Sequence, residues 1–251
     1  MKNKNTWVPS KFVLRNGRLT ASGNPEEVRA GSRLFAGIVA SFYGTYIRQY
    51  VRGKLADLGC GKVPLFEAYR DYVSDNICVD WGNAQSQNRY LDFECDLTQK
   101  LPLQDGEFDT IILSDVLEHI PEPMGLWREM SRILAVGGKL LMNVPFYYPI
   151  HSAPHDYYRY TEHALRRFAE EAGFKVVLLK PMGGTPEILG VFFAQHLQLI
   201  PVFGGFFAMA VQYLAGSFVK TGIGKNLSEK TAKAVPLAYF MVAEKIEAAR
   251  G

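Results

Sequence analysis

From Lys54 onward, short apolar runs alternate along the chain with segments whose apolar residues recur at helical spacing. Alternation of this kind predicts a parallel sheet whose strands are joined by crossover helices. Seven strands are expected, in the runs KLADLGC (54–60), NICVDWG (76–82), RYLDFECDL (89–97), FDTIILSD (108–115), KLLMNVPF (139–146), KVVLLK (175–180) and AYFMVAEK (238–245).

Helices are expected between and before these runs. A first helix is predicted from Asn24 as N-cap and Pro25 as first helical residue up to the first strand. A second follows Pro123 and stops at Gly137. A third, EHALRRFAEEAGF, is closed by Gly173, and Thr161 is a plausible N-cap for it.

An insertion of about fifty residues separates the last two expected strands. No Asp, Glu, Lys or Arg occurs from Ile188 to Val219, and Pro201, Gly204 and Gly205 interrupt this apolar stretch. Each of its two arms is shorter than the ~20 residues that span a bilayer, so a helical hairpin is predicted instead of a membrane span. Such a hairpin fits a membrane or lipidic acceptor, especially with Lys225, Lys230 and Lys233 following it, but equally a lid or an oligomer interface.

Composition narrows the class of protein. The chain has 251 residues, of which 48% are hydrophobic and 21% charged, as in an ordinary globular protein with one catalytic-size domain. Its 28 basic and 25 acidic residues are intermixed, and the net charge of +3 gives no argument for nucleic acid as a partner. No signal peptide follows the basic start, so a cytoplasmic location is expected, including the inner face of the membrane. The three cysteines form no CxxC pair, so neither a disulfide framework nor a zinc site is expected.

Three acidic markers follow the first three predicted strands. In LADLGCG, Asp57 precedes Gly59 and Gly61, and a carboxylate there suits an ammonium group better than a pyrophosphate. Asp80 ends the next strand, where a carboxylate can accept hydrogen bonds from both ribose hydroxyls. Asp96 and Leu97 end the third, where they can meet an adenine amino group and cover its ring. Ammonium, ribose and adenine together indicate S-adenosylmethionine.

The sequence resembles the class I S-adenosylmethionine-dependent methyltransferases of the small-molecule type, through LADLGCG, VD, CDL, LPLQDGEFDTIILSDVLEHI and LAVGGKLLMNVPF in this order. The resemblance implies a Rossmann-like, doubly wound α/β sheet of seven strands with the last strand antiparallel. It also implies S-adenosyl-L-methionine as cofactor. The cofactor-binding residues expected on this basis are Asp57, Gly59, Cys60, Gly61, Asp80, Trp81, Asp96, Leu97 and Ser114.

The expected organisation has four parts. An N-terminal extension and helix (1–53) precede the methyltransferase core (54–181), the apolar insertion (182–236), and the last core strand with the tail (237–251). The extension and the insertion depart from the family pattern, so they leave the acceptor open.

The stretch HSAPHDYYRYT, residues 151–161, follows the fifth strand and should face the acceptor, because loops at strand ends line the ligand crevice of such sheets. His155, or alternatively His151 or His119, can act as a general base or contact the acceptor, and Glu118 with His119 is expected near the cofactor. Asp156 can orient an imidazole, and Arg159 can hold an anionic acceptor or brace the loop. A purely structural loop, in which Asp156 and Arg159 pair, is the alternative. No metal is expected here, because no convincing ligand set accompanies the histidines.

The sequence therefore predicts an S-adenosylmethionine-dependent methyltransferase. The N/D-P-P-Y/F motif of nucleobase amino-methyltransferases is replaced by SDVL, which disfavours DNA or RNA bases as acceptors. The acceptor is expected to be a non-nucleic-acid molecule, most simply a hydroxyl of a lipid-linked, glycan or quinone-like molecule. Peripheral membrane contact through residues 188–219 and a homodimer are both compatible with the insertion. The alternative is a methyltransferase-like protein that binds the cofactor without turnover and serves as an interaction module.

Overall fold

The computed structural model describes residues 1–82 and 88–247; the end of the expected C-terminal tail, 248–251, lies outside the described residues. A seven-stranded sheet forms its centre, in the order β5-β4-β3-β6-β7-β9-β8. The strands are β3 (Gly53–Leu58), β4 (Val73–Asp80), β5 (Phe93–Glu94), β6 (Phe108–Ser114), β7 (Leu134–Pro145), β8 (Phe174–Met182) and β9 (Ala238–Lys245). β9 is antiparallel to both of its neighbours, and the β3, β4, β5, β6 and β7 pairings are parallel. The predicted fold class is thus confirmed.

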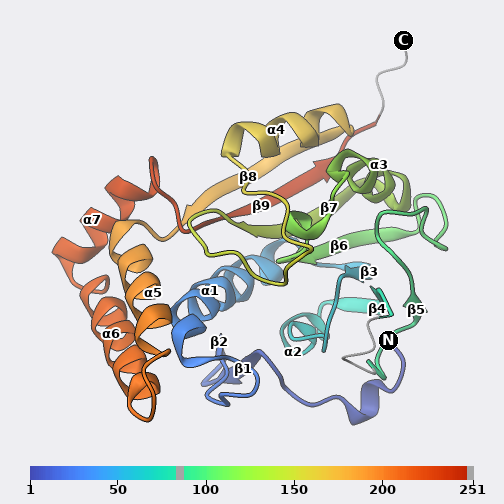
Figure 1. The fold of residues 1–251 in the computed structure, drawn as a ribbon. Coiled ribbons are helices and arrows are strands. Elements are labelled where there is room, and N and C mark those ends of the chain that lie inside the picture. Colours follow the sequence, from blue (N-terminus) through green and yellow to red (C-terminus); the bar gives the residue numbers. More distant parts are fainter. Residues whose placement is uncertain (83–87, 248–251) are drawn as a thin grey trace.

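Helices cover both faces of this sheet (Figure 1). One apolar core lies between the strands and α3 (Pro123–Ile133) with α4 (Glu162–Glu171), and includes the fully buried Trp127. The other lies under α1 (Arg33–Tyr50) and α2 (Phe66–Tyr69), where Tyr43 packs edge-on against Phe240 at 5.1 Å. Strands buried on both faces explain the continuous apolar runs in the sequence.

The apolar insertion is helical, as predicted, but it contains three helices: α5 (Thr185–Leu197), α6 (Gly204–Phe218) and α7 (Gly222–Ala232). The third helix starts because the Thr221 side chain caps it, accepting a hydrogen bond from Gly224 N. Figure 1 shows the three helices together at one side of the sheet, beside the start of α1. The buried Gln212 of α6 fixes them there, since its amide bonds to Leu34 N and Ala30 O. None of the described helices has the length and hydropathy needed to cross a membrane.

Three sequence predictions about elements need correction. The first helix begins at Arg33 and not at Asn24, because Arg29 is extended, so residues 24–28 form only an isolated turn before the 3-10 turn η2 (Ala30–Ser32). α3 ends at Ile133, four residues before Gly137, since β7 starts at Leu134. The third expected strand shortens to Phe93–Glu94, a two-residue exposed strand at the sheet edge.

The N-terminal extension also contains a β-hairpin that the sequence analysis missed. β1 (Phe12–Arg15) pairs with β2 (Arg18–Ala21) across Asn16 and Gly17, which both have positive φ. An Asn-Gly pair between two short runs is the usual signature of such a two-residue turn. A short 3-10 turn, η1 (Lys4–Thr6), precedes the hairpin. Residues before and after the hairpin, Lys11 and Glu27 to Ser32, reach a cavity at the carboxyl ends of the parallel strands.

Candidate active site

The turn after β3 is built from two glycines with left-handed backbone. Gly59 has φ +68°, and a Cβ at this position would lie 2.5 Å from the Val116 side chain, so only glycine fits. Gly59 N donates to Val79 O, and Gly61 N, two residues on, donates to Asp80 Oδ2 at 2.7 Å. The turn is thereby fastened to the end of β4, and its backbone forms part of a cavity wall.

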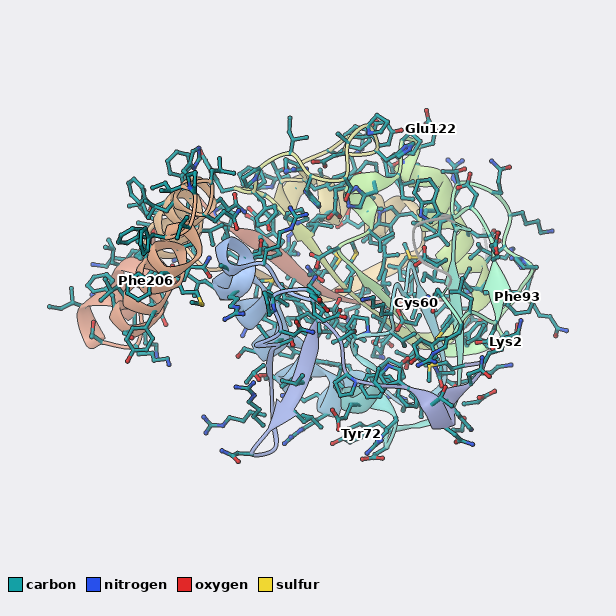
Figure 2. The ribbon with its side chains drawn as sticks, turned by 60° about the horizontal axis from the view of Figure 1, so that its bottom comes forward. Lys2, Cys60, Tyr72, Phe93, Glu122 and Phe206 are labelled. Carbon is teal, nitrogen blue, oxygen red and sulfur yellow. The ribbon has the colours of Figure 1, made fainter. Side chains whose placement is uncertain are left out.

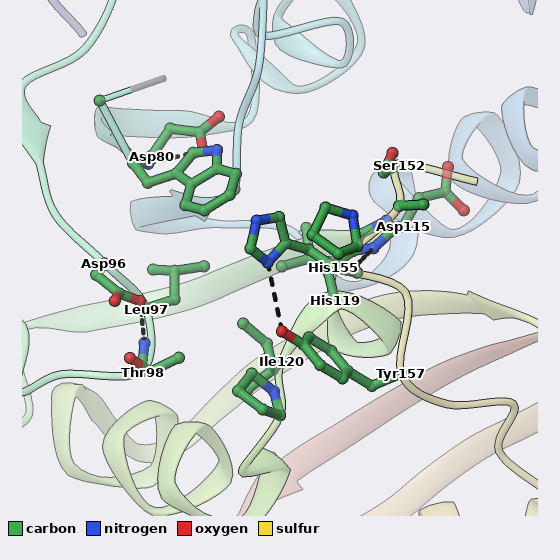
Figure 3. Close-up of a pocket in the computed structure, with 17 residues that line it drawn as sticks. Asp80, Asp96, Leu97, Thr98, Asp115, His119, Ile120, Ser152, His155 and Tyr157 are labelled. Carbon is green, nitrogen blue, oxygen red and sulfur yellow. Dashed lines mark hydrogen bonds between the residues drawn. The ribbon is translucent and has the colours of Figure 1, made fainter. Parts of the chain in front are cut away.

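A cavity of about 890 Å³ opens at this edge of the sheet (Figure 3). Five segments, at or just after the ends of β3, β4, β5, β6 and β7, contribute to its wall. The predicted cofactor residues among its lining are Gly59, Asp80, Trp81, Asp96 and Leu97. Asp80 already accepts bonds from Gly61 N and Trp81 N, which leaves lone pairs of its carboxylate for a ligand. Burial raises the pKa of Asp80, and those two backbone bonds oppose the rise.

Four predicted cofactor residues do not line this cavity. Gly61 lies in the turn just behind its wall, and Cys60 is buried. Ser114 donates to Asn143 Oδ1 at 2.9 Å at the end of β6. Asp57 is only 3% exposed, and its Oδ2 accepts a hydrogen bond from the Tyr69 hydroxyl at 3.3 Å. Burial raises the pKa of Asp57 to about 7. A direct contact between Asp57 and a ligand in this cavity therefore stays a prediction.

Residues 151–161, called the histidine loop below, contribute to the wall of this cavity, where His155 lies beside Tyr157 (Figure 3). The ring of His155 meets the Trp81 indole edge-on at 5.1 Å, and its Nδ1 is 3.3 Å from the Tyr157 hydroxyl. The backbone holds the loop in place, because Tyr157 N and Tyr158 N both donate to Glu118 O. His155 is thus placed in the wall of this cavity, beside Trp81.

Asp156 and Arg159 belong to the same loop and contact each other. Arg159 donates to both carboxylate oxygens of Asp156, at 2.6 and 2.8 Å, and to the carbonyls of Tyr148, Pro149 and Tyr158. The guanidinium holds the pKa of Asp156 at about 2. Neither residue belongs to the lining of this cavity or of the second one described below, and the contacts of Arg159 brace the loop.

A second cavity, of about 490 Å³, adjoins the first, and three residues line both: Asp115, His119 and Ser152. His151 lies in its wall, opposite the N-terminal extension. The remaining lining comes from four parts of the chain: Lys11; Glu27, Val28, Arg29, Ser32, Phe35 and Ala36; Glu118; and Pro145 with Tyr148. The two predicted histidines therefore face different cavities that share a wall.

Asp115 is a site residue that the sequence analysis did not select. It has φ +53°, lines both cavities, and accepts a hydrogen bond from Lys11 Nζ at 2.7 Å and another from the Asn143 amide. An acidic residue directly after a buried strand is a signal that could have identified it. Lys11, by contrast, lies 104 residues before Asp115 in the sequence, and nothing in its local sequence indicates that it reaches the site.

The strand order, the glycine turn after β3, and the acidic residues after β4 and β5 define a class I S-adenosylmethionine-dependent methyltransferase domain. Residues 56–142 match the family model described as "Methyltransferase domain".

Curated relatives share this part of the chain. A ubiquinone biosynthesis O-methyltransferase from Coxiella burnetii is 28% identical over 110 residues, 39% of this chain and 47% of its own. The chain thus spans about half the length of that relative. The enzyme of the same name from Chromobacterium violaceum is 26% identical over 163 residues, 53% of this chain and 69% of its own.

Solved structures with low sequence identity share the fold. The [4+2]-cyclase SpnF has a TM-score of 0.57 at 18% identity, with 96% of this chain and 88% of that chain covered. A geranyl diphosphate C-methyltransferase from Streptomyces coelicolor has a TM-score of 0.56 at 14% identity, with 89% and 85% covered. Its structure contains Mg²⁺, geranyl diphosphate and S-adenosyl-L-homocysteine.

Proposed function

We propose that the chain is an S-adenosylmethionine-dependent methyltransferase that methylates a hydroxyl of a small, non-nucleic-acid acceptor. The observation that carries this proposal is the pair of adjoining cavities, which meet at Asp115, His119 and Ser152. One cavity takes the cofactor and the other takes the acceptor. A shared wall lets the two reacting groups meet, which is the main requirement of a direct displacement.

The first cavity has the side chains that the cofactor requires. The Asp80 carboxylate accepts hydrogen bonds from the ribose hydroxyls, Leu97 covers the adenine ring, and Asp96 accepts from the adenine amino group. The turn at Gly59 and Gly61 admits the methionyl part close to the backbone. The bound cofactor supplies an electrophilic methyl group on a positively charged sulfur.

In the transfer, the acceptor oxygen forms a bond to the methyl carbon while the bond from that carbon to sulfur breaks. The hydroxyl proton must go to a base, and His155 is our first choice because it lines the cofactor cavity. His151, in the wall of the second cavity, is the alternative base. The Trp81 contact and the Tyr157 hydroxyl orient the His155 ring.

A quinone-like acceptor is supported by the two relatives named ubiquinone biosynthesis O-methyltransferase, although they match only part of the chain. The competing proposal is a cofactor-binding module without methyl transfer. It is favoured by the likeness to SpnF, which is named as a [4+2]-cyclase. Product formation separates the two proposals.

Calorimetry with S-adenosylmethionine, S-adenosylhomocysteine and NAD tests cofactor binding. We expect S-adenosylmethionine and S-adenosylhomocysteine to bind and NAD not to bind. A mass-spectrometric screen of cell extract with labelled cofactor then tests turnover. A labelled small-molecule product establishes methyl transfer. Cofactor binding without any labelled product would favour the binding module, and binding of NAD alone would overturn both proposals.

We further propose that α5 and α6 contact a membrane surface or a lipid-linked acceptor. Val202, in the loop that joins them, is 91% exposed, and Phe206 at the start of α6 is 66% exposed. Figure 2 shows Phe206 on this outlying group of helices. Lys225 and Lys230 of α7 add positive charge nearby, and an apolar face with adjacent basic residues suits an anionic membrane surface.

Co-sedimentation with anionic and neutral vesicles tests this contact. We expect wild type to bind anionic vesicles and salt to weaken the binding. A variant with Phe192→Glu and Phe206→Glu should lose binding while remaining folded, whereas Phe66→Tyr on the covered α2 should bind like wild type. If no vesicle binds, and the double substitution instead dissociates a dimer, the surface is an interface between copies of the chain.

A further inference from the structure

Glu118 is a buried carboxylate without a hydrogen-bond partner. Its side chain is 0% exposed, and neither oxygen forms a hydrogen bond within the described chain. A buried charge is strongly unfavourable unless it is paired or coordinates a metal ion. Glu118 lies in η3 (Leu117–His119) and lines the second cavity.

Two histidines turn toward this carboxylate. The Nε2 atoms of His119 and His151 are each 3.7 Å from the same oxygen, Oε1 of Glu118. This distance is too long for a hydrogen bond. The three ligand atoms all lie within 4.8 Å of one another. Around a tetrahedral ion with ligand bonds of ~2.1 Å, neighbouring ligands are ~3.4 Å apart, so a small side-chain movement completes the arrangement.

The second nitrogen of each ring already has a partner. His119 Nδ1 is 2.5 Å from His155 O, and His151 Nδ1 is 3.2 Å from Pro149 O and 3.4 Å from Asp156 Oδ2. When Nδ1–H donates to these oxygens, each Nε2 is left unprotonated at 3.7 Å from Glu118 Oε1. Metal-binding histidines usually donate their other N–H to a carbonyl or carboxylate in this way.

The backbone holds the three residues together before any ion binds. Tyr157 N donates to Glu118 O at 2.9 Å, and the buried Tyr160 hydroxyl donates to Leu117 O at 3.1 Å. These bonds fasten η3 to the loop that carries His151. The rings of His119 and His151 lie edge-on, with centroids 4.9 Å apart.

We propose that Glu118, His119 and His151 form a binding site for a divalent transition-metal ion, with Zn²⁺ as the best-matched ion. Two imidazoles and one carboxylate form a typical three-residue zinc set, which leaves a fourth position for a small molecule. All three residues line the second cavity, so that position is accessible to an acceptor hydroxyl. Mg²⁺ fits this site poorly, because it prefers oxygen ligands. This site was not expected from the sequence, and with it the base role falls to His155.

The proposal is tested by calorimetry. The full chain is first freed of metal with a chelator and is then titrated with Zn²⁺ alone. We expect one tightly bound ion per chain, and a Co²⁺-loaded sample should show the visible absorption of a four-coordinate site. His119→Ala and His151→Ala should each weaken Zn²⁺ binding at least ~100-fold, since even changes beside the ligands cost 10–100-fold. His163→Ala is the matched control, because that side chain is 86% exposed and lies outside the cluster.

Several outcomes would overturn the metal site. These are the absence of a tight ion in wild type, equal affinity in the His151→Ala and His163→Ala variants, and displacement of Zn²⁺ by equimolar Mg²⁺. The first two would leave Glu118 as the partner of a protonated histidine only, and the third would assign the ion to oxygen ligands instead of the two imidazoles. The result is independent of the proposed methyl transfer, because the titration uses no cofactor. Asp80→Ala, which should damage the cofactor cavity, should bind Zn²⁺ like wild type.

Discussion

The two cavities that we assign to the cofactor and to the acceptor, called the cofactor side and the acceptor side below, are built in different ways. On the cofactor side, Gly59, Asp80 and Asp96 each lie within a few residues of a strand end, and they follow one another along the chain. On the acceptor side, the second cavity combines Lys11, Arg29 and His151, which come from three separate parts of the chain. The first arrangement is a consequence of the fold, whereas the second depends on how an added N-terminal segment packs.

This difference has a chemical counterpart. Asp80 on the cofactor side is satisfied by the backbone N–H groups of Gly61 and Trp81. Glu118 on the acceptor side is buried without a hydrogen bond. Preformed backbone contacts suit a ligand that stays the same throughout a family. An unsatisfied carboxylate requires something further to compensate its charge, which is where the particular function of this chain should lie.

The largest expected effect is a loss of methyl transfer in His155→Ala without a loss of cofactor binding. His155→Ala should reduce methyl transfer by ~10²–10⁴-fold, because the acceptor hydroxyl loses its base, while cofactor affinity stays nearly unchanged. The measurement is labelled product formation beside calorimetry with S-adenosylhomocysteine. His163→Ala should match wild type in both assays. A loss of only two- or threefold would reduce His155 to a packing role. A larger loss in His151→Ala would transfer the base role to that residue only if His119→Ala, which removes another proposed zinc ligand, keeps its activity.

Much of the cofactor side was predictable because its signals are local. The glycine turn, Asp80, Asp96 and Leu97 were predicted at the carboxyl edge of the sheet, and the structure places Gly59, Asp80, Asp96 and Leu97 around one cavity. The register of a parallel sheet brings successive strand ends together, so position along the chain translates directly into position at this edge. Asp57 was harder to place, since a strand pattern does not reveal how deeply its last residues are buried.

The acceptor side was less predictable because its contacts are long-range. The contact between Lys11 and Asp115 joins residues 104 positions apart, and the Gln212 contact that places α6 spans 178. Neither apolar periodicity nor motif spacing encodes such pairs. The Glu118, His119 and His151 cluster was missed for the same reason: two of its members are adjacent in sequence, and the third comes from the loop after the next strand.

A second prediction concerns the stability of the cofactor side. The folded-state pKa of Asp57 is about 7, above its ordinary value of 3.8. The stability that the protonated Asp57 carboxyl contributes is therefore fully present below pH ~4 and is lost as the pH rises through 7. Asp57→Asn, which cannot ionise, should raise the free energy of unfolding at pH 8 by on the order of 4 kcal/mol, with the gain shrinking toward pH 4.

Urea unfolding at pH 4.5 and pH 8 measures this change. Asp71→Asn is the control, since that exposed carboxylate should show no comparable gain. The same Asp57→Asn variant should bind S-adenosylmethionine more weakly, if the ionised carboxylate attracts the ammonium group. An equal gain in stability at both pH values would contradict the raised pKa.

The smallest expected effect tests the cofactor side directly. Asp80→Ala removes the carboxylate that should accept from the ribose, and hydrogen bonds to a charged acceptor contribute ~1.5–3 kcal/mol. S-adenosylhomocysteine should therefore bind ~10–150-fold more weakly, as measured by calorimetry. Asp80→Asn retains one oxygen that can accept from Gly61 N or a ribose hydroxyl, so it should lie between wild type and the alanine variant. Unchanged affinity in a folded Asp80→Ala protein would remove Asp80 from the cofactor site, and the cofactor side would then be no more firmly assigned than the acceptor side.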